Sequence, residues 1–371
     1  MPQVSVVRCR DYDGGRLFSE VKKSVDLIGG IKRFVKPGQK VLLKPNLLKI
    51  AAAPEAVTTH PEFIRAVVRL CKEGGARVLI GDSPGGMVKI GQLYEQNGIA
   101  EIAQQENAEL VKFDAIVHKE GIPFAKIMDE VDVVISLPKF KTHSLTKITA
   151  AVKNVFGLVP GLYKVECHRQ APNHKVFAKM LAKIYGIVRP HLTIVDAVSA
   201  MDGEGPSAGN PYPLGLVVAS ADAVAVDAVL AKIIGIDPLS VATTYETHSL
   251  GLGTAQLTDI DICGEPLESV AVKNFTLPKI LALYRLPNGI IRNLVRFIPL
   301  IIGLDRDRCN ACGMCKNICP QQAIEVVTAR IKMNARRCIL CLCCCEICPQ
   351  NALYLRFLHR KKKYEKQNTG C

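Results

Sequence analysis

Residues 309–320 read CNACGMCKNICP, and residues 338–349 read CILCLCCCEICP. Both contain the spacing C-x-x-C-x-x-C-x-x-x-C-P, and the two copies are offset by a constant 29 residues. A coincidence of four cysteines and a proline at one offset is very hard to obtain by chance, so we interpret it as an internal duplication. The sequence therefore predicts a small domain that is built from two similar halves around its cysteines.

The spacing of these cysteines suits a metal centre. Thiolates that stand two residues apart on a tight loop converge on one soft metal. In each copy three such thiolates, with a fourth from elsewhere, meet the need of a cubane cluster for one thiolate per iron. A zinc ion needs only four ligands, so two C-x-x-C pairs would satisfy it and the other cysteines would be left over. Zinc stays an alternative, and we predict iron-sulfur clusters.

Residues 304–356 resemble the bacterial ferredoxin domain that carries two [4Fe-4S] clusters, and both motifs match it fully. In that family the fourth cysteine of each motif serves the cluster of the other half. The resemblance therefore implies two crossed ligand sets, which are Cys309, Cys312, Cys315 and Cys348 for one cluster and Cys338, Cys341, Cys344 and Cys319 for the other.

The second motif carries two cysteines beyond the repeated pattern, Cys343 and Cys345. Because Cys345 and Cys348 also have C-x-x-C spacing, a shifted choice of ligands in this half stays open. We expect the unshifted choice, in which the two extra cysteines remain thiols near the cluster. The proline after each fourth cysteine fixes φ and favours a helix start, so we also expect short helices over residues 321–324 and 350–353.

The N-terminal part of the chain alternates strand-like and helix-like segments. Residues 59–61 (THP) predict a helix start, and apolar side chains then recur at helical spacing up to Cys71. Residues 77–81 (RVLIG) follow two glycines and have the composition of a buried strand. Strands that alternate with helices predict an α/β domain with a large parallel or mixed sheet and flanking helices. The same reasoning predicts further strands at residues 4–8, 40–44, 131–137, 192–196, 214–219 and 260–263, and helices at 17–27 and 221–234.

The 371 residues, of which 49% are hydrophobic, suffice for two or three folded units. The net charge of +14 lies almost entirely towards the C-terminus, because residues 1–270 carry 30 basic and 29 acidic side chains. We expect an α/β domain over residues 1–265, an apolar and basic linker over 266–303, a small α+β ferredoxin-like domain over 304–358 and a basic tail over 359–371.

The composition also weighs against several protein classes. No stretch reaches the roughly 18 uncharged apolar residues of a membrane span, and no apolar core of an export signal is present near Met1. We therefore expect a cytoplasmic protein, with contact between the basic linker and an anionic membrane surface as a weaker alternative. Nucleic-acid binding is disfavoured, because aromatic residues are 5%, Trp is absent and the basic stretches lack interleaved aromatics.

Polar side chains gather where predicted strands end, which is where α/β sheets bind their ligands. Lysines, histidines and glycine-rich turns at one sheet edge suit a carboxylate or a phosphate. The sequence contains no G-x-G-x-x-G, Walker A or G-x-S-x-G motif. Taken singly, Lys44, Lys153 and His60 are each also explained as a solvated or helix-capping side chain. The candidate ligand-binding residues are Lys44, Asn46, His60, Asp82, Lys139, Lys141, His143, Lys153, Asn154, Asp202 and Glu204.

Six short motifs occur together in this part of the chain, namely KPNL at 44–47, THP at 59–61, GDSP at 81–84, LPKFKTH at 137–143, KNVFG at 153–157 and DGEGP at 202–206. With them, about residues 5–235 resemble domain of unknown function 362, uncharacterised iron-sulfur-centre proteins whose members often carry the same ferredoxin module. Asp202 stands where the family usually has Glu, and it keeps the carboxylate. The resemblance implies that the sheet domain is paired with clusters, and it implies no reaction.

These observations predict an electron-transfer protein with two [4Fe-4S] clusters, whose N-terminal domain binds a redox partner protein or a small anionic ligand. One alternative is a cluster-dependent reductase or lyase that acts on a small anion. Another is a low-potential activator or maturation factor for a different metalloenzyme. The sequence alone leaves open whether the protein is an enzyme. Exposed cubanes are labile, so we also expect sensitivity to oxygen.

Overall fold

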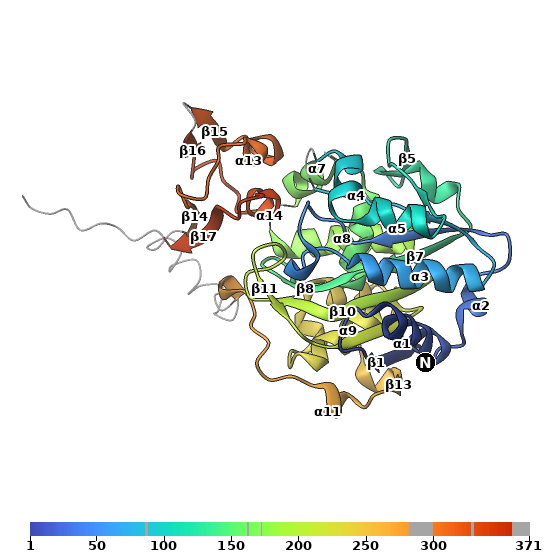
Figure 1. Ribbon diagram of the computed structural model, residues 1–371. Helices are drawn as coiled ribbons and strands as arrows, with labels where there is room; N and C mark the ends of the chain where they lie inside the picture. Colours follow the sequence, from blue (N-terminus) through green and yellow to red (C-terminus); the bar gives the residue numbers. More distant parts are fainter. Residues whose placement is uncertain (86–87, 162, 172, 282–299, 328–329, 358–371) are drawn as a thin grey trace, which may run out of the picture.

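The computed structural model describes residues 1–85, 88–161, 163–171, 173–281, 300–327 and 330–357 (Figure 1). Within these residues the chain forms a large α/β domain and a small cysteine-rich module beside it. Both predicted parts of the fold class are thereby confirmed. No helix among the described residues is long and apolar enough to cross a lipid bilayer.

The large domain is organised around one mixed sheet, for which eleven strands are described. Its main path runs β13 (Asp261–Gly264), β1 (Gln3–Arg8), β12 (Leu216–Ser220), β10 (Leu192–Asp202), β7 (Val133–Leu137), β2 (Lys40–Pro45), β3 (Arg77–Ile80) and β4 (Glu109–Leu110). The strands from β10 to β4 are parallel, whereas β12 is antiparallel to both of its neighbours. Each predicted strand is present, and the one at 192–196 continues to Asp202.

Helices cover both faces of this sheet, because successive side chains of the central strands point to opposite sides. Along β2, Val41 and Leu43 pack on one core and Leu42 on the other. The first core is closed by α1 (Gly14–Asp26), α3 (Pro61–Glu73), α4 (Ile90–Gln96) and α5 (Ile99–Gln105). The second is closed by α8 (His174–Val188), α9 (Ala223–Ile233) and the segment around α11 (Leu267–Val270).

The strand ends beyond β10 and β7 carry the chain towards the cysteine-rich module (Figure 1). There β8 (Lys139–His143) pairs with the far end of β10 and with β9 (Lys147–Thr149), while β11 (Asn210–Tyr212) pairs with β10. The remaining elements are α2 (Ile31–Phe34), β5 (Ile116–Lys119), β6 (Ile122–Ala125), α6 (Ala151–Asn154), α7 (Tyr163–Gln170), α10 (Ala242–Ser249) and five short 3-10 turns.

The duplicated sequence folds into two similar halves. The first and last strands of the module, β14 (Leu300–Leu304) and β17 (Leu353–Phe357), form one antiparallel pair. β15 (Ile324–Val327) and β16 (Arg330–Met333) form the other. A one-turn helix lies in each half, α13 (Met314–Ile318) and α14 (Cys343–Ile347). Left-handed backbone recurs at the same 29-residue offset, at positions 311 and 340, 313 and 342, and 322 and 351.

The short helices predicted after each Cys-Pro pair, over residues 321–324 and 350–353, are wrong. The chain turns there instead, because Gln322 and Asn351 have φ near +50° (49° and 47°), which no right-handed helix permits. The turn brings the next amide back onto the cysteine: Ala323 N lies 3.2 Å from the sulfur of Cys319, and Ala352 N lies 3.3 Å from that of Cys348.

The predicted linker is described in part. Residues 266–281 lie against the large domain, where Val270 and Phe275 belong to its core. Residues 282–299 and the predicted basic tail lie outside the described residues, as does the membrane contact predicted for the linker's basic stretch.

Candidate functional site

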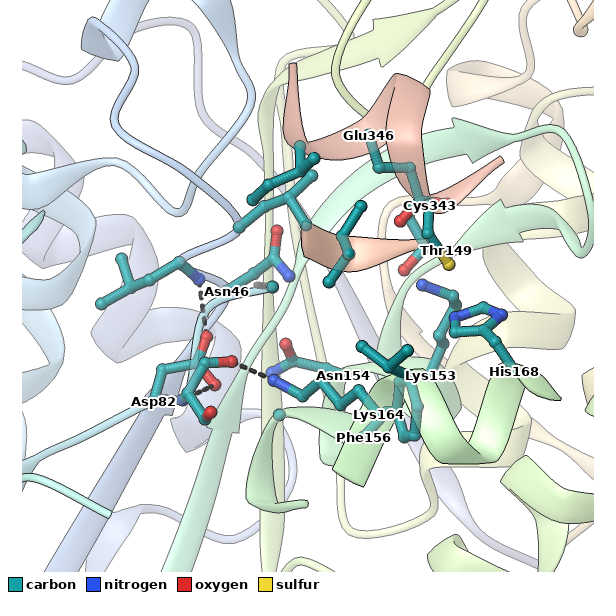
Figure 2. Close-up of a pocket in the computed structure, with 18 of the residues that line it drawn as sticks. Asn46, Asp82, Thr149, Lys153, Asn154, Phe156, Lys164, His168, Cys343 and Glu346 are labelled. Atoms are coloured by element: carbon teal, nitrogen blue, oxygen red, sulfur yellow. Dashed lines mark hydrogen bonds between the residues drawn. The ribbon is translucent and has the colours of Figure 1, made fainter. Parts of the chain in front are cut away.

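A cavity of about 90 Å³ lies where the large domain meets the cysteine-rich module (Figure 2). The large domain contributes the end of β2, the turn after β3, the end of β9 and the helices α6 and α7. The module contributes Ile318 and three residues of α14, Cys343, Glu346 and Ile347. We call this cavity the interdomain pocket, because both units supply its walls.

The short helix α6 carries two of the pocket residues, Lys153 and Asn154, and is held by a buried carboxylate. Asp227 on α9 accepts hydrogen bonds from the backbone N–H groups of Ala151 (2.7 Å) and Val152 (3.2 Å). Burial raises the pKa of Asp227 to about 7, although both backbone hydrogen bonds act to lower it. The two bonds satisfy N–H groups at the helix start that have no partner within the helix, which fixes α6 in place.

Lys44 lines the pocket but is fully occupied by its own neighbours. Its ammonium lies 2.7 Å from Asp82 Oδ1 and donates to Asn154 Oδ1 (3.1 Å) and to the backbone carbonyl of Pro45 (2.7 Å). Since an ammonium has three donors, none remains for a ligand. Gly157 permits this close packing, because a Cβ there would collide with Lys44 and Asp82.

Lys153 is the contrasting case. Within the described residues its ammonium makes no hydrogen bond and no ion pair, and its side chain is half-buried at the pocket. Burial lowers the pKa of Lys153, and the nearby carboxylate of Glu346 partly offsets that effect. Figure 2 shows Lys153 below Cys343 and Glu346. A ligand in the pocket would therefore meet an ammonium whose donors are available.

Lys164, on α7, lines the same pocket and donates to the backbone carbonyls of Ser83 and, at 3.4 Å, Pro84. Burial lowers the pKa of Lys164 to about 7; the carboxylate of Asp82 opposes the shift, and nearby lysines add to it. A lysine with a pKa near 7 exchanges its proton readily at neutral pH, which is the property of a general acid or base.

Glu346 joins the module to the large domain. His143 accepts a hydrogen bond at Nδ1 from the backbone of Leu145 (3.0 Å), so its ring proton lies on Nε2, 3.2 Å from Glu346 Oε1. Burial lowers the pKa of His143 to about 4. Burial acts against the charge of Glu346, but His143 and Lys153 outweigh it and lower the pKa of that carboxyl to about 2.

A second contact across the same boundary is made by Lys49. Its buried ammonium donates to the backbone carbonyl of Cys348 (3.2 Å) and to Asn351 Oδ1 (2.8 Å). Cys348 is the fourth cysteine of the second motif, and Asn351 is the left-handed residue of the turn that follows it. The contact therefore ties the turn at one predicted cluster ligand to the large domain.

Four of the predicted ligand cysteines come together in the cysteine-rich module, although the described residues form no group of three or more side chains positioned to hold a metal ion. One small cavity in the module is lined by Cys319, Cys338, Cys341 and Cys344, which come from both halves of the duplication. Cys315 interacts electrostatically with Cys344, Cys312 and Cys348, which come from both predicted ligand sets. The extra residues Cys343 and Cys345 do not line that cavity, and Cys343 faces the interdomain pocket instead. Thiol side chains are the donors that an iron-sulfur cluster takes, and the crossed assignment of these cysteines stays a prediction.

The structure brings together some of the eleven predicted ligand-binding residues and separates others. Five line the interdomain pocket, namely Lys44, Asn46, Asp82, Lys153 and Asn154. Two lie one contact behind it: Lys141 donates to Asn46 Oδ1 (2.8 Å), and His143 contacts Glu346.

The other four predicted residues do not line the pocket. Lys139 is paired with Asp196, and the backbone N–H of His60 donates to the same carboxylate. Asp202 and Glu204 accept hydrogen bonds from the backbone at residues 276 and 279. The prediction that all eleven converge on one ligand is corrected accordingly, because buried carboxylates and a packed segment already engage these four.

Sequence reasoning missed further pocket residues: Thr149, Phe156, Lys164, His168 and Glu346. Lys164 and His168 stand four residues apart and so share one face of α7. This spacing in the sequence could have indicated that both belong to one site. No pattern in the sequence indicated Glu346, because this residue reaches the pocket only when the cysteine-rich module packs against the large domain.

Comparisons with known proteins agree with these two parts. The family described as "Domain of unknown function (DUF362)" matches residues 41–232, and a 4Fe-4S binding domain matches residues 302–325. The "Thylakoid-associated protein sll1697" of Synechocystis sp. is 35% identical over 288 residues, which cover 75% of this chain and 88% of that protein.

Among solved structures, the lactate racemase apoprotein from Thermoanaerobacterium thermosaccharolyticum has a TM-score of 0.37 and 9% identity. The similarity covers 59% of this chain and 54% of that one, and it is too weak to inform the site. The family match spans more than half of the chain, and the curated relative is matched over most of its length. The chain is therefore an iron-sulfur protein that belongs to the DUF362 family and carries a 4Fe-4S binding domain behind it.

Proposed function

We propose that the protein transfers electrons by way of two [4Fe-4S] clusters and that its large domain holds a small anionic ligand beside them. The single observation that carries this proposal is the position of α14. Cys344 of this one-turn helix lines the cavity with the other three cysteines, while Cys343 and Glu346 line the interdomain pocket. One turn of helix would thus separate the proposed cluster site from the proposed ligand site.

The residues that would hold the clusters are the two crossed sets, Cys309, Cys312, Cys315 and Cys348, and Cys338, Cys341, Cys344 and Cys319. When bound, each cubane supplies one site that accepts and releases a single electron. The backbone of the module adds an N–H donor to one sulfur of each set, from Ala323 to Cys319 and from Ala352 to Cys348. Such donors stabilise negative charge on the sulfurs and raise the reduction potential.

The pocket supports an anion of few atoms. Its volume of about 90 Å³ is too small for a nucleotide. The ammonium of Lys153, which pairs with no side chain in the described part of the chain, supplies positive charge. Leu47, Phe156, Ile318 and Ile347 supply apolar walls. A small carboxylate, with a charged end and a short apolar body, combines both requirements.

An anaerobic redox titration of the holoprotein tests the electron-transfer proposal. We expect reversible uptake of about two electrons per chain, accompanied by the electron paramagnetic resonance signals of two reduced [4Fe-4S] clusters. Uptake of about one electron, or iron that is lost on reduction, would contradict the proposal.

Lys164 favours a second candidate function, the reduction of a small anion with a carbonyl group. Conversion of the carbonyl to a hydroxyl consumes two electrons and two protons. Lys164, with a pKa of about 7, gives one proton and solvent gives the other, while an external low-potential carrier protein is the source of the electrons. Glyoxylate is a suitable probe because it fits the pocket's size class, and acetate is its control since it lacks a reducible carbonyl. Formation of glycolate by the reduced holoprotein supports this function, and its absence contradicts it.

Changing Lys153 to Met tests the ligand site itself. The substitution keeps the length of the side chain and removes its charge. A hydrogen bond from a charged donor contributes about 1.5–3 kcal/mol, so we expect the affinity for acetate or glyoxylate to fall by about tenfold or more. Titration calorimetry on the oxidised holoprotein measures it.

The matched control is Lys89→Met, which removes the same charge from an exposed side chain outside the pocket. We expect this variant to bind both anions as the parent does. Equal affinities for the parent and the Lys153 variant would rule out Lys153 as the anion's partner.

A further inference from the structure

The two halves of the cysteine-rich module differ in charge at one duplicated turn. Before the first cysteine of each motif, residues 305–308 read DRDR and residues 334–337 read NARR. The turns have the same shape. Asp305 Oδ1 accepts from the backbone of the residues two and three positions on, and Asn334 Oδ1 does the same. The first turn is neutral in sum, whereas the second carries two positive charges.

The second turn also leaves its arginines without counter-charges. In the first half, Arg308 lies 3.5 Å from the carboxylate of Asp305. Arg337 is its equivalent, but Asn334 replaces the acid, so that ion pair is lost. Throughout the described residues, neither Arg336 nor Arg337 takes part in an ion pair, and both are exposed.

These side chains line a groove of about 540 Å³ along the β15–β16 hairpin. Its basic members are Lys332, Arg336 and Arg337, and its one carboxylate is Glu325, which stands opposite Lys332 across the hairpin. We call it the basic groove. In Figure 1 the hairpin lies on the side of the module that faces away from the large domain. The side chains of Lys332, Arg336 and Arg337 are exposed, so the groove is accessible to a partner.

The basic groove adjoins the cavity of one proposed cluster. It shares Ala323 and Met333 with the cavity that Cys319, Cys338, Cys341 and Cys344 line. Arg337 also immediately precedes Cys338 in the chain. A protein seated in the groove would thus be one layer of side chains from the cluster.

We propose that the basic groove is the docking surface of an acidic electron-carrier protein, which exchanges electrons with the cluster beneath it. The inference rests on the proposed electron-transfer function and identifies the partner's charge and its point of contact. Complementary charge brings such partners together quickly and orients them. A nucleic acid fits less well, because no aromatic side chain lines the groove to stack on bases. A membrane surface is flat, whereas this site is recessed.

The experiment compares the holoprotein with Arg336→Glu/Arg337→Glu. A photoreduced acidic [2Fe-2S] ferredoxin of the plant type is the probe for the rate of cluster reduction, and its oxidised form is the probe for binding by calorimetry. In low salt we expect the affinity and the rate of the double variant to be about tenfold or more below those of the parent. When the salt concentration is raised, we expect the affinity and the rate of the parent to fall towards those of the variant, so that most of the difference disappears.

The matched control is Arg306→Glu/Arg308→Glu, which reverses the same two charges in the equivalent turn of the first half. We expect it to change both quantities by less than about twofold. A groove variant that matches the parent in affinity and rate overturns the proposal. The proposal is equally overturned if the groove variant loses binding to vesicles that contain phosphatidylserine while its affinity for the ferredoxin is unchanged.

A neutral small reductant, photoreduced 5-deazariboflavin, separates this inference from the function on which it rests. It needs no docking surface, so we expect it to reduce the parent and both variants at equal rates. If the parent is reduced by deazariboflavin and the ferredoxin does not depend on the groove, the docking proposal alone fails. If the clusters of the parent accept no electron from either reductant, the electron-transfer function fails as well.

Discussion

Replacing Cys319 and Cys338 together by alanine is expected to leave one cluster in the protein, whereas replacing Cys315 and Cys319 together removes both. Each double variant loses two cysteines, so they differ only in how the ligands are shared. In the crossed arrangement Cys319 and Cys338 belong to one cluster, as their common cavity indicates. Cys315 and Cys319 stand in one motif but serve different clusters. Iron and acid-labile sulfide per chain measure the outcome, with about four iron atoms expected for the first variant and nearly none for the second.

Uncrossed ligation, in which each motif builds its own cluster, gives the reverse pattern, and that result would refute the assignment. Cys345→Ala is the control for the ligand register, since it removes the cysteine next to Cys344. We expect about eight iron atoms per chain in this variant, as in the parent. A loss of four there would mean that the second motif uses the shifted spacing from Cys345 to Cys348.

Much of this architecture is readable from the sequence because its signals are periodic. The 29-residue duplication reappears in the backbone, where Gly313 and Leu342 both adopt left-handed φ. The helix expected after residues 59–61 begins at Pro61, with His60 accepting from the backbone as its N-cap. Those features depend on neighbours in the chain. The helices predicted after the two Cys-Pro pairs are wrong for a reason that lies outside this local pattern. In each half the chain turns so that a backbone N–H donates to the cysteine sulfur, and this interaction outweighs the preference of proline for a helix start.

The sequence did not show which lysines pair with buried carboxylates and which face the pocket. Lys44, Lys139 and Lys153 all follow strands and all suit an anion site. In the folded chain Lys44 pairs with Asp82 and Lys139 pairs with Asp196, whereas Lys153 makes no ion pair with any residue that the structure describes. Both carboxylates are distant in sequence from the lysines that they pair with, and Asp196 also lies inside an otherwise apolar strand, so the sequence does not indicate these pairs. Which lysine is neutralised is therefore decided by tertiary packing, and the same holds for the arrival of Glu346 at the pocket.

Changing Asp196 to Ala is expected to destabilise the large domain by about 3–5 kcal/mol, because it leaves a buried charge without its partner. The side chains of Asp196 and Lys139 are both fully buried (0% exposed), and Lys139 Nζ lies 2.9 Å from Asp196 Oδ2. The other carboxylate oxygen accepts from the hydroxyl of Tyr12 at 2.7 Å, and the backbone of His60 donates to Oδ2 at 2.9 Å. Tyr12 also stacks on His60, with ring centroids 3.6 Å apart. Urea denaturation of the anaerobic holoprotein measures the loss.

Two comparisons separate a buried charge network from a ligand site. Asp129→Ala removes the same type of side chain from a half-exposed pair with Lys119, so we expect a loss of only about 0–1 kcal/mol. In Lys139→Met/Asp196→Ala both charges are gone, and we expect at least about half of the stability to return. Because neither residue lines the interdomain pocket, this double variant should bind acetate as the parent does. If stability returned while anion binding was lost, Lys139 would belong to the ligand site after all, and the division of the lysines drawn from their buried partners would be wrong.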